Sequence, residues 1–244
     1  MPSQRTTATA LTALLVAALA GCQGGAPKTD TQSFDFAGDK LVVDAREVGV
    51  VIAQGSAGSI GVDRTLKGKA TDDGAATLAL DNGVLTMGVH CAGVTLTCEA
   101  DHVVRVPPGV AIELKSTGSR VEAKGLTGDV TATLTEDAAI ALAEPSGALA
   151  LDAKDSSITV TGAKSPSVTA VVALAGNVTL EFAAAPQRVE ARAADGDAAV
   201  VLPAGPETYR VDAGGAQPVA DDPASSRTVT VRAGEGRATV KKAG

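Results

Sequence analysis

A repeat of about twenty residues constrains this chain more than any other feature of its sequence. An apolar triplet with period two, typical of a strand with one buried face, occurs seven times at a spacing of 19 to 21 residues. The triplets are Val110-Ile112-Leu114, Val130-Ala132-Leu134, Leu149-Leu151-Ala153, Val168-Ala170-Val172, Val189-Ala191-Ala193, Tyr209-Val211-Ala213 and Val229-Val231-Ala233. A fixed period indicates that units stack on one another around a shared core. We expect one inward column made of Ile112, Ala132, Leu151, Ala170, Ala191, Val211 and Val231.

A second short apolar strand lies about ten residues into most repeats, and turn-forming residues separate the two strands. These corners carry Gly118, Asp137, Asp155 and Gly196, each three residues before a second strand. Two strands and two corners per unit predict an all-β, single-domain parallel β-solenoid (β-helix) with coils of about 19–21 residues. A β-sandwich is the alternative, because sandwiches also have short strands and frequent turns.

Charged residues between the apolar ones give a test of this register. Parallel stacking at the repeat spacing predicts that Glu190 lies beside Arg210. It also predicts that Asp212 lies between Arg192 and Arg232. Opposite charges across neighbouring strands would favour this arrangement.

The predicted solenoid domain spans residues 34–244, with one interruption. Near its amino end, the pair Leu41 and Val43 recurs nineteen residues later as Ile60 and Val62. Residues 67–105 do not keep the period, so we expect an irregular amino-terminal cap or a longer coil there.

The amino terminus has the pattern of a bacterial lipoprotein. A short polar segment with one basic residue, Arg5, precedes about ten apolar residues, too few to span a membrane. The sequence Leu19-Ala20-Gly21-Cys22 resembles the lipobox, in which the cysteine is lipidated and becomes the first residue of the mature chain. We therefore expect a signal peptide at 1–21, lipidation of Cys22 and a flexible tether at 22–33. An ordinary signal peptide followed by a chance cysteine is the alternative.

A lipoprotein signal peptide predicts that the protein lies at the extracytoplasmic face of a bacterial cell membrane and is anchored by lipid. Residues 22–244 hold 20 basic and 28 acidic side chains, a net charge of −8. Such a chain would repel a phosphate backbone, so we expect no nucleic-acid partner. The sequence has three Phe, one Tyr and no Trp, which leaves few rings for stacking on sugars or for interface hot spots.

Cys91 and Cys98 are the strongest chemical signal in the sequence. In an exported protein, two nearby cysteines favour a disulfide. A metal site is the alternative, because His90 and His102 flank the pair. The spacing fits no standard zinc pattern, so we predict a disulfide and no metal site. We expect both histidines to be exposed, in a loop and at a strand end.

No catalytic constellation is recognisable, and we predict neither enzymatic activity nor a cofactor. The nucleophile-elbow, zinc-protease and phosphate-loop motifs are absent from the sequence. Two acid pairs, Asp195 with Asp197 and Asp221 with Asp222, match the residue types of solenoid glycosidases. Paired acids in turns are usually solvated turn residues, which is how we interpret them.

Three segments carry a family resemblance: Val106-Pro107-Pro108-Gly109, Ser116-Thr117-Gly118 and Gly125-Leu126-Thr127-Gly128. Here the chain resembles the putative-adhesin family of bacterial envelope proteins, a domain of unknown function with a predicted parallel β-solenoid. The resemblance covers about residues 40–240. Later repeats depart from it, with Asp137 and Asp155 in place of the corner glycine. It implies adhesion and supplies no catalytic residue.

The sequence thus favours a non-enzymatic, lipid-anchored envelope protein that is adhesin-like or offers a scaffold or interaction surface. The expected partners are the membrane, through Cys22, and an envelope protein or surface polymer. A carbohydrate-active β-solenoid enzyme and an accessory lipoprotein in envelope-stress sensing are the alternatives. A solute-binding lipoprotein does not fit, because such receptors are built from two lobes rich in helices, and the sequence predicts none.

Overall fold

The computed structural model describes residues 26–93, 97–214 and 217–244. The predicted signal peptide and Cys22 lie outside the described residues. Within them the protein consists of β-strands and one short 3-10 helix, η1 (Lys69–Thr71), so the all-β class is confirmed. No helix in the described part of the chain is long and apolar enough to cross a membrane.

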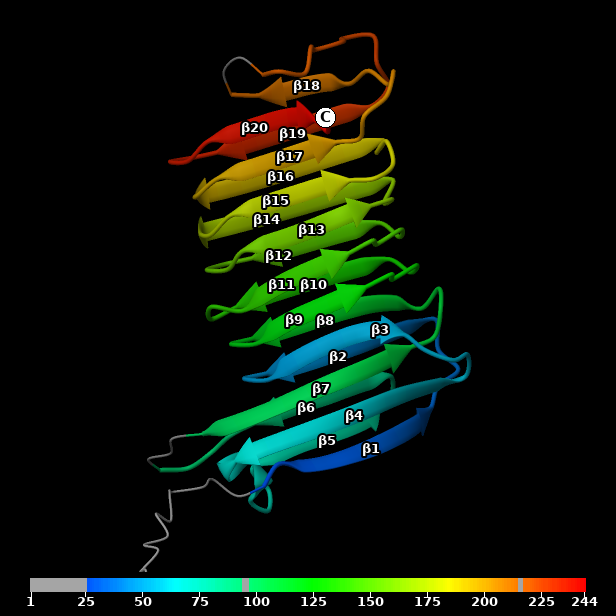
Figure 1. Cartoon of the computed structure of the whole chain (residues 1–244), viewed down its shortest axis with the longest axis vertical. Helices are drawn as coiled ribbons and strands as arrows, with labels where there is room; N and C mark the ends of the chain where they lie inside the picture. Colours follow the sequence, from blue (N-terminus) through cyan, green and yellow to red (C-terminus); the bar gives the residue numbers. More distant parts are fainter. Residues whose placement is uncertain (1–25, 94–96, 215–216) are drawn as a thin grey trace, which may run out of the picture.

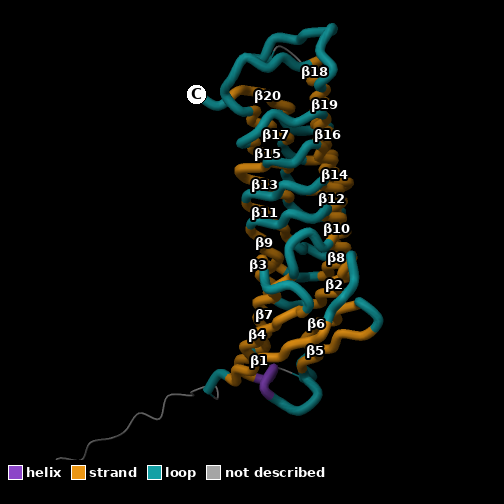
Figure 2. The backbone as a smooth tube through the Cα atoms, turned by 90° about the vertical axis from the view of Figure 1, so that its right-hand side faces the viewer, coloured by secondary structure: helices purple, strands orange, loops and turns teal. Residues whose placement is uncertain are grey.

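The twenty strands form two ten-stranded sheets that face each other (Figures 1 and 2). In spatial order, sheet A contains β1 (Lys28–Asp35), β4 (Ser59–Gly68), β7 (Cys98–Val106), β3 (Gly49–Gln54), β9 (Arg120–Lys124), β11 (Ala139–Ala143), β13 (Ile158–Ala163), β15 (Val178–Phe182), β17 (Ala198–Leu202) and β20 (Ala238–Lys242). Sheet B contains β18 (Arg210–Ala213), β19 (Thr228–Ala233), β16 (Arg188–Asp195), β14 (Ser167–Ala175), β12 (Leu149–Ala153), β10 (Val130–Thr135), β8 (Ala111–Thr117), β2 (Lys40–Arg46), β6 (Val84–Val89) and β5 (Ala76–Asp81).

From β8 to β17 the chain alternates between the two sheets, and each strand pairs in parallel with the next strand of its own sheet. The alternating sequence explains the packing, since residues at even and odd positions of a strand point to opposite faces. In β12, Leu151 is buried in the core and Asp152 is exposed. The buried side chains of both sheets form one continuous hydrophobic core.

The predicted inward column is correct for five of its seven residues. Ala132, Leu151, Ala170, Ala191 and Val231 are aligned with one another as expected. Ile112, however, pairs with Val130, so its place in this column belongs to Leu114. Val211 pairs with Val229 and not with Val231. The repeat of about twenty residues fixes which face a side chain occupies, whereas loop lengths at the corners shift the pairing by two residues.

The charge register predicted for the carboxyl-terminal repeats is correct for Asp212 beside Arg232 and otherwise wrong, because β19 lies between β16 and β18. Glu190 therefore faces Thr230 and not Arg210. Arg232 forms an ion pair with Asp212, but Arg192 pairs with Glu190 on its own strand. Backbone hydrogen bonds hold strands of any sequence, so the order of neighbours does not follow from the charges alone.

The amino-terminal strands depart from the regular pattern. Strands β2 and β3 lie beside β8 and β9, whereas β4 pairs antiparallel with β1 and β7. The predicted recurrence of Leu41 in β4 is therefore not a stacked repeat, because β2 and β4 lie in different sheets. Residues 67–105, expected to be irregular, contain η1, the antiparallel hairpin β5–β6 and β7. The tether prediction is wrong for residues 28–33, which belong to β1.

Close stacking dictates the residues at one corner of the repeat. Gly176 and Gly196 have φ angles of 139° and 141°, which residues with a Cβ rarely adopt. A Cβ on Gly196 would lie 2.2 Å from the carbonyl oxygen of Gly176, and one on Gly236 would lie 2.0 Å from that of Gly196. Each turn thus rests directly on the backbone of the turn beneath it.

Side chains at the same corner tie successive turns together. The backbone N–H of Asn177 donates to Ser157 Oγ at 3.1 Å. The N–H of Asp197 donates to Asn177 Oδ1, and that of Arg237 donates to Asp197 Oδ1, both at 2.8 Å. These bonds satisfy N–H groups that the turn leaves outside the strand ladders.

We predict that Gly196→Ala destabilises the protein by about 3 kcal/mol or more, through strain and the clash with the Gly176 carbonyl. Gly125→Ala is the matched control, because Gly125 also has a positive φ but has open space around its Cβ position. We expect it to cost about 1 kcal/mol. Urea unfolding measures both, and equal losses would show that the turns do not stack this closely.

Candidate functional site

Cys91 and Cys98 form the predicted disulfide, and their Cα atoms lie 6.1 Å apart. Cys98 begins β7, and Cys91 follows β6, so the bond closes the connection between the two sheets at this level. Bonded sulfurs are not available as thiolate ligands, which removes the metal site considered for the pair. No cluster of three metal-ligating side chains occurs among residues 26–93, 97–214 and 217–244.

The expectation for His102 is wrong, although His90 is exposed as predicted. His102 lies within β7, is 1% exposed and shares its inward face with Ala100 and Val104. Its position in the alternation of the segment from Ala100 to Val106 would have revealed this. Burial, together with the positive charge of Arg64, lowers the pKa of His102 to about 4.

His102 belongs to a polar file inside the end of the core, which we call the inner polar file: His102, Arg64, Asp30 and Gln32. His102 in β7 pairs with Arg64 in β4, and Arg64 pairs with Asp30 in β1. The Arg64 guanidinium donates two hydrogen bonds to the Asp30 carboxylate, at 2.9 and 2.8 Å. These bonds hold the pKa of Asp30 below its usual range, against the opposing effect of burial.

The file has no catalytic arrangement. Neither ring nitrogen of His102 has a hydrogen-bond partner of ordinary geometry among the described residues. The carboxylate of Asp30 is engaged by Arg64 and by Gln32, whose amide donates to it at 3.3 Å. At neutral pH a histidine with a pKa of about 4 is uncharged and Asp30 is held ionised by Arg64, so the two do not form an acid–base pair.

The buried histidine predicts a pH dependence of stability. In the unfolded chain its pKa is 6.5, so between pH 6.5 and 4 the unfolded state binds more protons than the folded state. Stability therefore falls as the pH is lowered through this range, by on the order of 3 kcal/mol from this group. In His102→Leu this contribution disappears, so the difference in unfolding free energy between the variant and the wild type changes between pH 6.5 and 4. If plots of unfolding free energy against pH stay parallel for the two proteins, the assignment is contradicted. His90→Leu is the exposed control.

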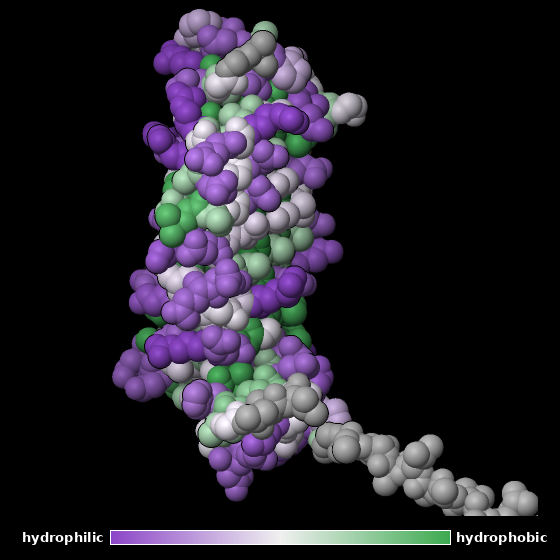
Figure 3. Space-filling model, turned by 90° about the vertical axis from the view of Figure 1, so that its left-hand side faces the viewer, coloured by the Kyte–Doolittle hydropathy of each residue, from purple (hydrophilic) through white to green (hydrophobic). Residues whose placement is uncertain are grey.

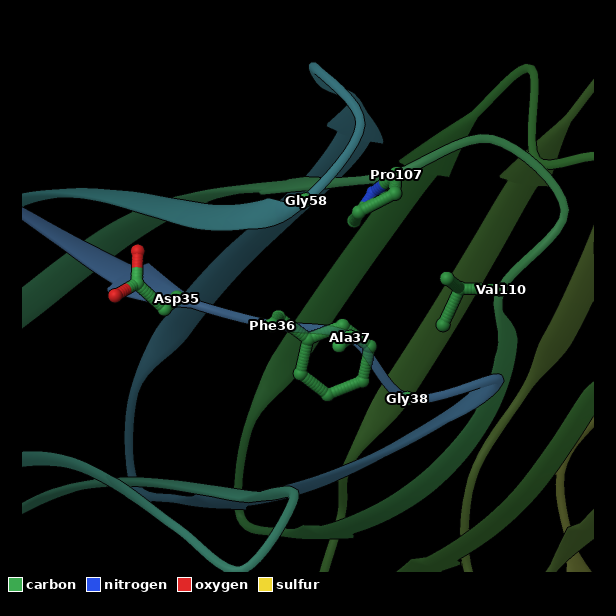
Figure 4. A pocket seen from close by; sticks show the side chains of 7 residues that line it. All are labelled: Asp35, Phe36, Ala37, Gly38, Gly58, Pro107 and Val110. Carbon is green, nitrogen blue, oxygen red and sulfur yellow. The ribbon is translucent and has the colours of Figure 1, made fainter.

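An open hollow lies where the chain passes from sheet A to sheet B, between β1 and β2 (Figure 4). It has a volume of about 500 Å³, and its lining is mostly apolar: Asp35, Phe36, Ala37, Gly38, Gly58, Pro107 and Val110. A second hollow, of about 520 Å³, lies along the same segment and is bounded by Phe34, Lys40, Leu80 and Asn82 among others. Asp35 is the only ionisable side chain of the first hollow, which suits contact with an apolar group better than chemistry.

The outer face of sheet A carries two large apolar side chains. Val51 and Val103 are 41% and 36% exposed and lie opposite each other on β3 and β7. Beside Val51 begins a shallow hollow of about 410 Å³ over small residues such as Ala141 and Thr159. Figure 3 shows a side of the stack on which corners connect the two sheets, and there hydrophilic side chains are spread along the whole length with apolar ones between them. The outer face of sheet A is a surface for contact, with a shallow hollow and no deep cleft among the described residues.

Three of the four acids in the pairs noted in the sequence accept hydrogen bonds from turns. Asp197 accepts the corner hydrogen bond from Arg237, and Asp221 Oδ1 accepts one from the N–H of Val211 at 2.9 Å. The pKa of Asp222 lies below its usual range, because the Thr208 hydroxyl and then the N–H of Ala224 hydrogen-bond to its carboxylate. Asp195 is exposed at the end of β16.

No protein-family model matches the chain, and no curated protein matches its sequence. Its fold resembles that of a putative adhesin from Bacteroides fragilis, with a TM-score of 0.52 and 13% identity over 91% of this chain and 100% of that one. A putative cell adhesion protein from Clostridium sporogenes aligns with a TM-score of 0.33 and 12% identity, over 89% of this chain and 100% of that one. A putative adhesin from Parabacteroides distasonis gives 0.29 and 11%, over 88% and 97%. The first likeness shows a shared fold, at an identity too low to transfer residues or partners.

Proposed function

We propose that this chain is a non-enzymatic, lipid-anchored protein of the bacterial cell envelope that offers the outer face of sheet A as an adhesin-like interaction surface. The observation that carries the proposal is the shared fold with a putative adhesin, which covers all of that protein. The exposed valines and small residues on sheet A give such a face apolar contact area. The partner is an envelope protein or a surface polymer.

The architecture that we propose for this role is the parallel β-solenoid. Parallel pairing of strands about twenty residues apart, in both sheets, supports it. Facing sheets are common to solenoids and sandwiches, but sandwich sheets are typically antiparallel. The antiparallel strands β1, β4, β7, β5 and β6 then form one end of the stack, which we call the base.

Lipidation of Cys22 supplies the anchor in this proposal. Six residue steps separate Cys22 from Lys28, where β1 begins, and they span at most about 20 Å. The base is thereby held close to the membrane surface. The net charge of −8 makes attraction to anionic headgroups unfavourable, so attachment depends on the lipid.

The anchor is tested by Cys22→Ala in cells that process lipoproteins. We expect the wild-type chain to incorporate labelled palmitate and to stay with membranes through a high-salt wash. The variant should lose the label and appear in the soluble fraction, with unchanged urea unfolding of the folded domain. A variant that still partitions with washed membranes would place the anchor elsewhere.

The interaction role is tested with isolated cell-wall polymer and envelope membranes of the host. We expect the purified chain to co-sediment with one of these fractions, and Val51→Glu with Val103→Glu to reduce the bound amount about tenfold, since buried charge opposes apolar contact. Ala150→Glu, on the outer face of sheet B between Thr131 and Thr169, is the control. Time-dependent release of reducing sugar from the polymer would contradict the proposal and favour the carbohydrate-active alternative.

A further inference from the structure

The two ends of the strand stack are finished differently. At the carboxyl-terminal end, residues 217–227 fold over the last strands (Figure 1, top). The N–H of Asp222 donates to the carbonyl of Tyr209 at 2.9 Å, and the N–H of Val211 donates to Asp221 Oδ1 at 2.9 Å. The two bonds satisfy the Tyr209 carbonyl and the Val211 N–H, which lie on the side of the chain that faces away from β19.

Gln217 finishes the neighbouring edge in sheet A. The N–H of Val240 in β20 donates to Gln217 Oε1 at 2.8 Å, and Gln217 Nε2 donates to the carbonyl of Ala238 at 3.3 Å. One side-chain amide thus takes the place of a further strand. The carboxyl-terminal end is closed to strand addition in both sheets, which is how proteins protect exposed sheet edges.

At the base, the last strands are β1 in sheet A and β5 in sheet B. Strand β1 has a protective feature, because its Asp30 points inward and charges there disfavour pairing with another strand. Strand β5 has none: its inward residues are Ala76, Leu78 and Leu80, which pack against the core and stay partly exposed. The hollow bounded by Phe34 and Leu80 opens beside this edge.

The free hydrogen-bonding groups of β5 can be assigned from its hairpin. Asn82 and Gly83 both have positive φ, the type I′ geometry of a two-residue turn, so Asp81 and Val84 form its closing pair. Antiparallel alternation then directs the N–H and C=O groups of Leu78 and Leu80 to the outer edge. In the described residues, no hydrogen bond reaches these groups.

We propose that the base binds the base of a second copy of this chain, with β5 of each copy paired antiparallel to β5 of the other. A partner at this end pairs with the edge of β5 and faces the side chains between the sheets, which are apolar in β5 and include Asp30 and Gln32 in β1. A second copy fits by symmetry, because a two-fold axis perpendicular to the sheets sets β5 against β5 and leaves the two β1 strands facing each other without pairing. The closed carboxyl-terminal end prevents head-to-tail growth, so association stops at a dimer.

The sequence of β5 suits this pairing. With Leu78 opposite Leu80 of the second copy, both lie inward and meet as hydrogen-bonded pairs. Ala79 then lies opposite Ala79 on the outer face, and Asp81 lies opposite Thr77. Inward residues thus meet inward residues, and no two like charges are opposed in β5. The inference does not rest on lipid anchoring or on the adhesin-like role.

The test uses the full-length chain with Cys22→Ala, in which an added cysteine is the only free thiol beside the Cys91–Cys98 bond. In one protein Ala79→Cys is added, and in the control Asp212→Cys is added on β18, the sheet B edge at the other end. Residues in such a non-hydrogen-bonded pair lie about 4.5 Å apart at Cα, within the reach of a disulfide. Under mild oxidation we expect Ala79→Cys to form a cross-linked dimer at least about tenfold faster than Asp212→Cys, because pairing raises its effective concentration.

Sedimentation velocity of the Cys22→Ala chain without added cysteines gives an independent result. We expect a species of twice the monomer mass at tens of micromolar. A monomer throughout this range, or equal cross-linking of the two cysteine variants, would overturn the proposal. So would cross-linking of Ala79→Cys in cells to a different protein in place of its own copy.

Discussion

The direct stacking of one turn of backbone on the next is the constraint on which the rest of this structure depends. Neighbouring strands in both sheets are held by backbone hydrogen bonds at a spacing of about 4.8 Å. A corner that widened this spacing would break the ladders on either side. Glycines at 176, 196 and 236 meet the requirement, because carbonyl oxygens of the preceding turn occupy the places where their Cβ atoms would lie. Asn177 and Asp197 then bond the turns to each other at the same corner.

The same spacing explains the composition of the core. Two sheets that pack face to face leave room for layers of Ala, Val, Leu and Ile, and most buried side chains of the described residues are of these types. The chain therefore needs few aromatic residues. Buried serines such as Ser116 and Ser156 occur within the regular stack, whereas the inner polar file around Arg64 lies where the stack ends. There the antiparallel strands β1, β4 and β7 no longer face a full apolar layer, and Asp30 remains partly exposed.

The sequence predicted those features that depend on local pattern. Period-two alternation identified the strands and their buried faces, and the compartment implied by the signal-peptide pattern led to the disulfide between Cys91 and Cys98. Features that depend on distant pairing were missed. Nothing local indicates that β19 inserts beside β16, or that β2 lies against β8, because any two strands can share a backbone ladder. His102 was expected at the surface, but its alternation with Ala100 and Val104 along β7 puts it on the buried face.

Distances across sheet B test the central claim, the ordered parallel stack, most directly. Asp44, Asp152, Arg192 and Arg232 belong to one outward row, on β2, β12, β16 and β19. One spin label is placed at 44 and the second at 152, 192 or 232, and the distances are measured by pulsed electron–electron double resonance. We expect backbone separations of about 14, 24 and 29 Å, because the strands lie three, five and six steps of about 4.8 Å apart. A 44–232 distance no longer than the 44–152 distance would show that the chain folds back on itself, and would contradict the stack.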